Sequence, residues 1–254
     1  MQTPSPLSPN PVVLVTGSAT GIGRACAVQF ASLGYNVVIN FSRSGDEAEV
    51  TRRLVAAEGV RALVVQCDVS DDAAVRRMFA DVEREFGRLD VLVNNAGKTH
   101  FIEHNDLEAV TDEVWDQILG VNLKGPFSCI RAAVPLLRAS GGGAVVSISS
   151  VAGISGLGSS VPYCASKGAL NTLTKSLARA LAPEIRVNAV CPGPVDSRWL
   201  RAVMSEEELY GRTKDYPLPR PARPEDIADA VVYLATGTSL TTGQLLVVDG
   251  GRTM

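Results

Sequence analysis

The sequence predicts a single α/β domain built on a doubly wound, parallel, seven-stranded sheet with helices on both faces. Seven short runs rich in β-branched residues alternate with amphipathic stretches of helical length. The first runs are almost uniformly apolar, which is typical of strands that helices cover on both faces. The chain has 254 residues, of which 46% are hydrophobic, so it can bury the core that such a sheet requires.

The expected strands occupy residues 12–17, 36–41, 61–68, 89–97, 143–150, 185–193 and 244–251. The two longest helical patterns cover residues 111–139 and 162–182. Pro135 lies inside the first of them and predicts a bend or break there, because proline removes a helical hydrogen bond.

Two segments stand outside this alternation. Residues 1–11 contain four prolines and predict a disordered leader, which leaves residues 12–254 as the single domain. Residues 194–221 are polar, are flanked by prolines and follow the sixth strand. We expect this second segment to be a lid over a ligand site, with a plain surface excursion as the alternative.

Composition excludes several classes of protein. A formal net charge of -3 with scattered lysines and arginines predicts no surface for nucleic acid or an anionic membrane. The N-terminus has no signal-peptide pattern, and no apolar run reaches the ~18 residues of a membrane span. The five cysteines form no CxxC pair and are expected to be buried, reduced thiols: Cys26, Cys67, Cys129, Cys164 and Cys191. These features indicate a cytoplasmic protein without a metal site.

The stretch TGSATGIG, residues 16–23, follows the first strand and opens a helix. Gly17, Gly21 and Gly23 allow a sharp turn and let a pyrophosphate approach the helix N-terminus, where free amides and the helix dipole stabilise it. The strand before the turn and the helix after it are the context that this motif requires. The alternative is a tight turn that binds nothing.

Tyr163 and Lys167 are four positions apart in PYCASKG and would lie on one face of a helix. A free tyrosine has a pKa near ~10, and a nearby cation is expected to lower it. The pair could therefore exchange a proton with a bound substrate. Ser147, Ser149 and Ser150 end the fifth strand, where open α/β sheets bind ligands. A solvated helix surface and a serine-rich turn are the alternatives for these two features.

Several motifs in order, from about Val12 to Gly251, resemble the short-chain dehydrogenase/reductase family. They are the GxxxGxG turn, NNAG (94–97), YxxxK, CPG (191–193), RPEDIADAVVYLA (223–235) and TGQLLVVDGG. The resemblance implies a Rossmann-type fold, a nicotinamide cofactor and hydride transfer between that cofactor and a carbonyl or secondary alcohol. It also implies a homotetramer that pairs the long helices and the last strand.

The family pattern assigns roles to individual residues. Tyr163 is the general acid/base, Lys167 supports it, and Ser150, thirteen residues earlier, binds the substrate oxygen. Asn122 matches the asparagine that holds a water of the proton relay. The implied cofactor contacts are Gly17, Ser18, Thr20, Gly21, Ile22, Gly23, Ser42, Arg43, Asp68, Val69, Asn95, Ala96, Gly97, Tyr163, Lys167, Pro192, Gly193 and Val195. Ser197 keeps a hydroxyl where relatives often have threonine.

The end of the second strand reads NFSRSGDE and bears on which nicotinamide cofactor is used. Asn40 and Phe41 stand where a carboxylate would bind the ribose 2'-hydroxyl of NAD(H). Ser42 and Arg43 suit a 2'-phosphate, so NADP(H) is favoured over NAD(H). One departure opposes this reading, because many NADP-using relatives have an arginine where this chain has Thr20.

We therefore expect an NADP(H)-dependent oxidoreductase, with 3-oxoacyl-acyl-carrier-protein reduction as the leading specific role. An acidic acyl carrier would favour a basic patch, for which Arg131, Arg198 and Arg201 are candidates. The alternatives are a sugar, polyol or small secondary-metabolite alcohol dehydrogenase, and a cofactor-binding regulator without turnover. His100 either lines the substrate pocket or lies in a surface loop. Neither His100 nor His104 has other potential metal ligands near it in the sequence.

Overall fold

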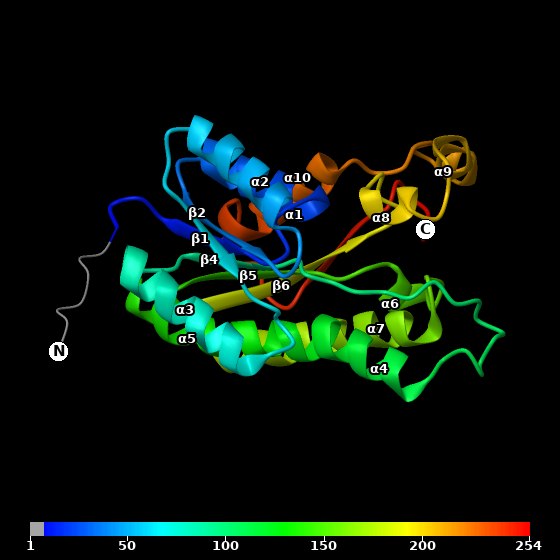
Figure 1. Ribbon diagram of the computed structural model, residues 1–254, viewed down its shortest axis with the longest axis horizontal. Helices are drawn as coiled ribbons and strands as arrows, with labels where there is room; N and C mark the ends of the chain where they lie inside the picture. Colours follow the sequence, from blue (N-terminus) through cyan, green and yellow to red (C-terminus); the bar gives the residue numbers. More distant parts are fainter. Residues whose placement is uncertain (1–7) are drawn as a thin grey trace.

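A central sheet lies between two layers of helices in the computed structural model, which describes residues 8–254 (Figure 1). The strands are β1 (Val12–Val15), β2 (Asn36–Phe41), β3 (Ala62–Gln66), β4 (Val91–Asn94), β5 (Gly143–Ile148), β6 (Ile185–Pro192) and β7 (Leu245–Val248). All neighbouring pairs are parallel, in the order β3-β2-β1-β4-β5-β6-β7. The doubly wound parallel sheet and its seven strands are confirmed.

Each face of the sheet is covered by three long helices, which explains the uniformly apolar strands. One face carries α1 (Gly21–Ser32), α2 (Gly45–Ala57) and α10 (Pro224–Thr236), and the other carries α3 (Asp72–Phe86), α5 (Gly125–Ala139) and α7 (Val161–Leu181) (Figure 1). Val13 and Val15 pack toward the first layer, whereas Val12 and Leu14 pack toward the second. All four are fully buried, so β1 contributes to two cores.

The carboxyl ends of the strands carry the remaining short elements. These are α4 (Asp112–Leu119), α6 (Ala152–Ser155), α8 (Arg198–Arg201) and α9 (Glu206–Thr213) (Figure 1). The strand order reverses between β1 and β4, and open α/β sheets bind ligands in the crevice at such a reversal. The topology therefore directs attention to the loops that follow β1, β4, β5 and β6.

The break expected at Pro135 is wrong, because α5 continues through that residue. Pro135 lies on the exposed side of the helix, so water can hydrate the carbonyl that loses its partner. The helical pattern is interrupted earlier, at a π-helical turn, η1 (Gly120–Lys124). This turn contains Asn122, one of the residues assigned to the site, and π-turns within helices are frequent at functional sites.

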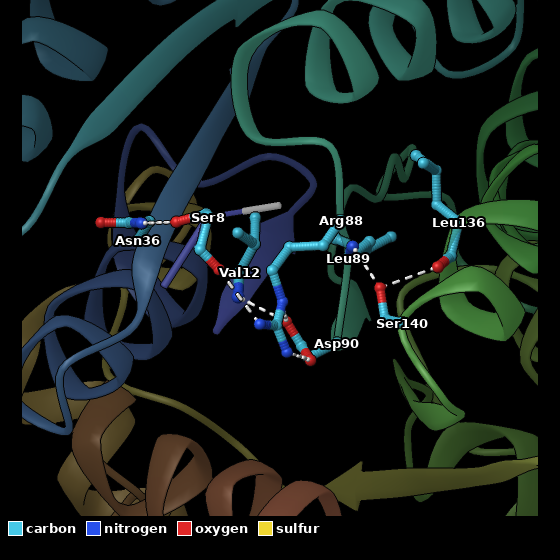
Figure 2. Close-up of polar contacts among 8 residues, drawn as sticks. All are labelled: Ser8, Val12, Asn36, Arg88, Leu89, Asp90, Leu136 and Ser140. Carbon is cyan, nitrogen blue, oxygen red and sulfur yellow. Dashed lines mark hydrogen bonds and ion pairs between the residues drawn. The ribbon is translucent and has the colours of Figure 1, made fainter. Parts of the chain in front are cut away.

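Of residues 8–11, Ser8 and Pro11 contact the sheet while Pro9 and Asn10 are exposed, so the expected disordered leader is ordered where it meets the sheet. Residues 1–7 of that prediction lie outside the described residues. Ser8 is buried, its hydroxyl accepts a hydrogen bond from Asn36 Nδ2 at 2.8 Å, and its carbonyl accepts one from Arg88 at 3.1 Å (Figure 2). Arg88 also forms an ion pair with Asp90, which accepts the Val12 amide at 2.7 Å. This network fixes the end of the sheet opposite the crevice.

Candidate active site

The glycine turn between β1 and α1 lies against the loop that follows β4. Gly17 and Gly21 adopt φ values of +63° and +56°, which favour glycine. A Cβ on Gly17 would lie 2.9 Å from Ala96 Cα, so the two loops need a glycine to approach this closely. Asn95 Nδ2 joins them by donating to the carbonyls of Thr16 and Gly17, at 2.9 and 3.0 Å.

Asn40 supports the glycine turn from β2. It is buried, its Oδ1 accepts the Gly17 amide at 3.1 Å, and its Nδ2 donates to the Cys67 carbonyl at 3.0 Å. The Ser18 hydroxyl accepts the Asn40 amide at 3.1 Å and donates to the Val15 carbonyl at 2.8 Å. The sequence analysis treated Asn40 only as the place of a missing carboxylate and missed this role. An amide side chain in an otherwise apolar strand was the available signal.

Tyr163 and Lys167 lie in the first two turns of α7. The Ser160 hydroxyl caps this helix by accepting the Tyr163 amide at 3.4 Å. Lys167 is buried, and its Nζ donates to the Ile148 carbonyl at the end of β5 at 2.8 Å. The same Nζ lies 5.7 Å from the centre of the Tyr163 ring, so the expected pairing of phenol and ammonium is present.

Ser150 and Ser149, which follow β5, both line the cavity but have different hydrogen-bond partners. Ser150 lines the same cavity as Tyr163, and its Oγ accepts the Ala152 amide at 3.1 Å. Ser149 is buried and donates to Asn171 Oδ1 at 2.6 Å and to the Lys167 carbonyl at 3.3 Å. Ser150 is thus placed to meet a ligand, while Ser149 holds α7 against β5.

Asn122 connects the loop after β4 to α7. Its Oδ1 accepts the Lys98 amide at 2.8 Å, and its Nδ2 donates to the Lys98 carbonyl at 2.9 Å and to Ser166 Oγ at 3.1 Å. Asn122 is fully buried, and both hydrogens of its amide group are used by the protein. Asn122 lies behind the lining of the cavity, and its contact with a relay water remains a prediction.

A cavity of about 1590 Å³ joins the glycine turn to Tyr163 and Lys167. The predicted cofactor residues that line it are Gly17, Thr20, Gly21, Ile22, Ser42, Arg43, Asp68, Val69, Asn95, Ala96, Gly97, Tyr163, Lys167, Pro192, Gly193 and Val195. Ser18 and Gly23 lie behind this lining: a Cβ on Gly23 would come within 2.5 Å of the Gly17 carbonyl oxygen. These two residues shape the turn and do not form the wall of the cavity.

The opposite end of the cavity has an apolar wall that the sequence analysis did not foresee. Trp199 of α8 lies edge-on to Tyr163, with ring centres 6.2 Å apart and planes at 87°. Phe101 and Leu157 also line the cavity and are 45% and 62% exposed. Exposed apolar side chains that gather at one cavity mark a surface for a ligand or partner, whereas scattered ones do not.

Comparisons with known proteins agree with this geometry. The family model for enoyl-(acyl carrier protein) reductase matches residues 17–253. The protein named ketoacyl reductase 2 of the granaticin polyketide synthase from Streptomyces violaceoruber is 45% identical over 246 residues, which cover 95% of each chain. The 3-oxoacyl-[acyl-carrier-protein] reductase FabG of Staphylococcus aureus strain Mu50 is 40% identical over 243 residues, 95% of this chain and 97% of that one.

A crystal structure described as a short-chain dehydrogenase/reductase from Burkholderia xenovorans superposes with a TM-score of 0.91 at 41% identity. It covers 96% of this chain, and 98% of its own chain is matched. This chain is a short-chain dehydrogenase/reductase. It is therefore an oxidoreductase that acts on carbonyl and alcohol groups, as the sequence analysis expected.

The dehydrogenase/reductase site fits a dinucleotide on its own geometry. The cavity continues from the glycine turn to Tyr163, and the Cβ position of Gly21 faces open space. At its adenosine end Asp68 accepts hydrogen bonds from the amide and hydroxyl of Ser70, at 2.9 and 2.7 Å. The Ser70 hydroxyl, together with its amide, holds the pKa of Asp68 below its ordinary value, so the carboxylate stays charged.

The expectation that Lys167 lowers the pKa of Tyr163 is not met in the protein alone. Burial raises the pKa of Tyr163 to about 12, although a contact with the Ser150 hydroxyl opposes the rise. Burial also lowers the pKa of Lys167 to about 8. Desolvation is the largest cause for both groups, and the Lys167 ammonium is bonded to the Ile148 carbonyl rather than to the phenol. Tyr163 is consequently protonated at neutral pH, as a proton donor must be.

The structure corrects two further predictions and decides against one alternative for His100. His100 does not line the cavity, and its ring is bonded to Gln117 at 3.1 Å; His104 lines the cavity instead. The candidate basic patch is neutralised, because each arginine has a carboxylate partner. The pairs are Arg131 with Asp72, Arg198 with Glu47, and Arg201 with Asp196. Cys164 is half-buried, whereas the other four cysteines are buried as expected.

Within residues 8–254, no helix is both long enough and apolar enough to span a bilayer. The same residues contain no cluster of three or more potential metal ligands.

Proposed function

We propose that the protein is an NADP(H)-dependent reductase of apolar 3-oxoacyl or related ketone substrates. The observation that carries this proposal is the placement of Ser150, Tyr163 and Lys167 on one cavity with the glycine turn. A bound nicotinamide cofactor supplies the hydride. The chain's own residues bind the carbonyl oxygen and deliver the proton.

Each residue has a separate task in this mechanism. Ser150 donates a hydrogen bond to the substrate carbonyl oxygen and orients it. Tyr163 transfers its hydroxyl proton to that oxygen as negative charge develops, which general acids do most effectively when positioned within hydrogen-bond reach. Lys167 lies 5.7 Å from the centre of the Tyr163 ring and donates to the Ile148 carbonyl, so it holds this turn of α7 against the end of β5. Asn122 holds the loop after β4 and α7 in register, so that the three groups stay aligned.

The preference for NADP(H) is supported by Ser42 and Arg43, which follow β2 and line the adenosine end of the cavity. A guanidinium makes strong, charge-assisted hydrogen bonds to phosphate. No carboxylate stands at the end of β2, because Asn40 occupies that position and is committed to the glycine turn.

The apolar wall favours acyl or ring ketones over sugars and polyols. A sugar site requires several polar groups that satisfy the ligand's hydroxyls. Trp199, Phe101 and Leu157 give apolar contact area, and the polar side chains of Glu103, His104 and Ser159 line the same cavity. The two ketoacyl reductases named above are consistent with an acyl substrate.

The test compares substrates directly by loss of reduced-nicotinamide absorbance. The wild-type protein should reduce a 3-oxoacyl thioester or a bicyclic ketone with NADPH, and should turn over aldoses or polyols at least tenfold more slowly. Trp199→Ala should raise KM for the apolar ketones several-fold, while the distant Trp115→Ala control leaves it unchanged. Faster turnover of sugars would support the alcohol-dehydrogenase alternative, and no turnover of any carbonyl would support a regulator.

The protein is also proposed to act in the cytoplasm as a homotetramer. All five cysteines are free, as expected in a reducing compartment. Tyr233 on α10 and Val247 on β7 are 51% and 38% exposed, and an interface along these elements would cover them. Light scattering at micromolar concentration should give about four times the chain mass, and a monomer would refute this assembly.

A further inference from the structure

The short helix α8 lines the cavity with Arg198, Trp199 and Leu200, and ion pairs hold it at both of its ends. Arg201 donates to both carboxylate oxygens of Asp196, at 2.6 and 2.8 Å. Arg198 reaches in the other direction, to the first turn of α2. Its Nη1 donates to Glu47 Oε1 at 2.7 Å, and its Nη2 lies 3.5 Å from Ser44 Oγ.

This second contact places the Arg198 guanidinium at the adenosine end of the cavity. Ser44 is the N-cap residue of α2 and directly follows Ser42 and Arg43. Arg198, Ser42 and Arg43 all line the same cavity. A side chain from the substrate-side segment thus joins the loop that is proposed to bind the ribose 2'-phosphate.

The charges around this loop require a second cation if a phosphate is to bind. A phosphate monoester carries about -1.5 to -2 charges at neutral pH. Arg43 supplies one positive charge, but that charge also acts on the Asp68 carboxylate, and Glu47 brings a second negative charge to the start of α2. Position 20, where many NADP-using relatives have an arginine, is the uncharged Thr20 in this chain. Arg198 can supply the charge that this position lacks.

The Arg198 and Glu47 pair is suited to exchange its partner. The two side chains are 63% and 39% exposed, and ion pairs between exposed groups are weak. A phosphate oxygen would compete well for the guanidinium, because it can accept a bidentate pair of charge-assisted hydrogen bonds. With NAD(H) no such competitor is present, and Arg198 can remain with Glu47.

We propose that Arg198 is a specificity-determining residue that exchanges Glu47 for the 2'-phosphate of NADP(H). This inference rests on the cofactor preference proposed above. It assigns recognition of the phosphate to two segments, the loop after β2 and α8, and makes Glu47 the partner that holds α8 when no phosphate is bound. Glu47 then opposes phosphate binding in two ways: it competes for Arg198, and it repels the anion.

The test measures binding of NADPH and NADH separately, by calorimetry or by fluorescence of the reduced nicotinamide, without any substrate. Arg198→Gln should weaken NADPH binding about tenfold or more and change NADH binding by less than about twofold. Arg198→Lys keeps the charge but loses the planar fork, so it should fall between the two. Glu47→Gln should strengthen NADPH binding a few-fold and leave NADH unchanged.

Arg220→Gln is the matched control, because Arg220 is a similarly exposed arginine paired with Asp226 and does not line the cavity. Its affinities should equal those of the wild type, and circular dichroism should show that all four variants are folded. Equal losses of affinity for NADPH and NADH in Arg198→Gln would mean that Arg198 binds the pyrophosphate that both cofactors share. Unchanged affinities would mean that Arg198 contacts neither the pyrophosphate nor the 2'-phosphate. Either result refutes the inference. Tighter wild-type binding of NADH than of NADPH would instead refute the proposed cofactor preference.

Discussion

Gly153 of α6 is predicted to be essential because α6 packs directly on the backbone of α7 at Lys167. A Cβ at position 153 would lie 2.5 Å from Lys167 C, 2.6 Å from Gly168 N and 2.8 Å from Lys167 O. All three atoms belong to a helix backbone and cannot rotate away, so one of the two helices must shift.

Overpacking of this kind costs about 1–3 kcal/mol, and backbone contacts place Gly153→Ala at the upper end. For a chain of this length, a loss of about 2–3 kcal/mol lowers Tm by roughly 5–10 °C. The shift would also move Lys167 relative to Ser150, and a displacement of about 1 Å at a catalytic group can reduce the rate about a hundredfold. Gly153→Ala should therefore lose both stability and kcat.

Thermal unfolding and steady-state reduction of a ketone by NADPH measure the two effects. Gly211→Ala is the control, since Gly211 lies in α9 with open space around its Cβ position. Alanine is a better helix former than glycine, so this variant should be neutral or slightly stabilised. Wild-type Tm and kcat in Gly153→Ala would show that α6 can move freely, and would refute the argument that its close approach positions Lys167.

Two further predictions concern the buried lysine and the far end of the sheet. The pKa of Lys167 is lowered to about 8 in the folded chain, so the unfolded chain binds more protons between pH 8 and about 10.5. Burial of Lys167 therefore lowers the free energy of unfolding at neutral pH, and this penalty shrinks as the pH rises through that window. Denaturant titrations of the apoprotein measure the free energy of unfolding of Lys167→Met relative to that of the wild type. This difference should shift by about 3 kcal/mol in favour of the wild type between pH 7 and pH 10.5. A pH-independent difference would show that the lysine is not desolvated. Asp90→Ala removes the acceptor of the Val12 amide and the partner of Arg88, and should lower the free energy of unfolding by about 2–4 kcal/mol. The control is Asp81→Ala, at an exposed ion pair with Arg84, which should change it by less than about 0.5 kcal/mol. Equal effects of the two variants would contradict the stabilising role of the contacts among Val12, Arg88 and Asp90.

The architecture could be predicted from the sequence because β-branched runs and helical patterns alternate without ambiguity. Strand ends were less predictable, since the last residues of each run leave the sheet to form the loops of the crevice. The run 89–97 shows this: only Val91–Asn94 pair in β4, and Asn95 turns to bond the glycine loop.

The candidate site was only partly predictable, because some of its features depend on contacts between distant segments. The motif positions located Tyr163, Lys167 and Ser150 on one cavity. Motif spacing could not reveal that Trp199 lies edge-on to Tyr163, nor that Arg198 reaches Glu47, 151 positions earlier. The expected lowering of the Tyr163 pKa by Lys167 failed for a related reason. Desolvation shifts the pKa of both groups, and it depends on packing that the sequence does not show.

Cofactor binding and turnover of Tyr163→Phe, measured on the same preparation, test the central claim most directly. Phenylalanine keeps the ring beside Trp199 and removes only the hydroxyl, which is the proposed proton donor to the substrate carbonyl oxygen. We expect kcat for ketone reduction to fall by about 10²–10⁴-fold, while Kd for NADPH stays within about threefold of the wild type. A variant that still reduces ketones at the wild-type rate would show that the proton comes from elsewhere.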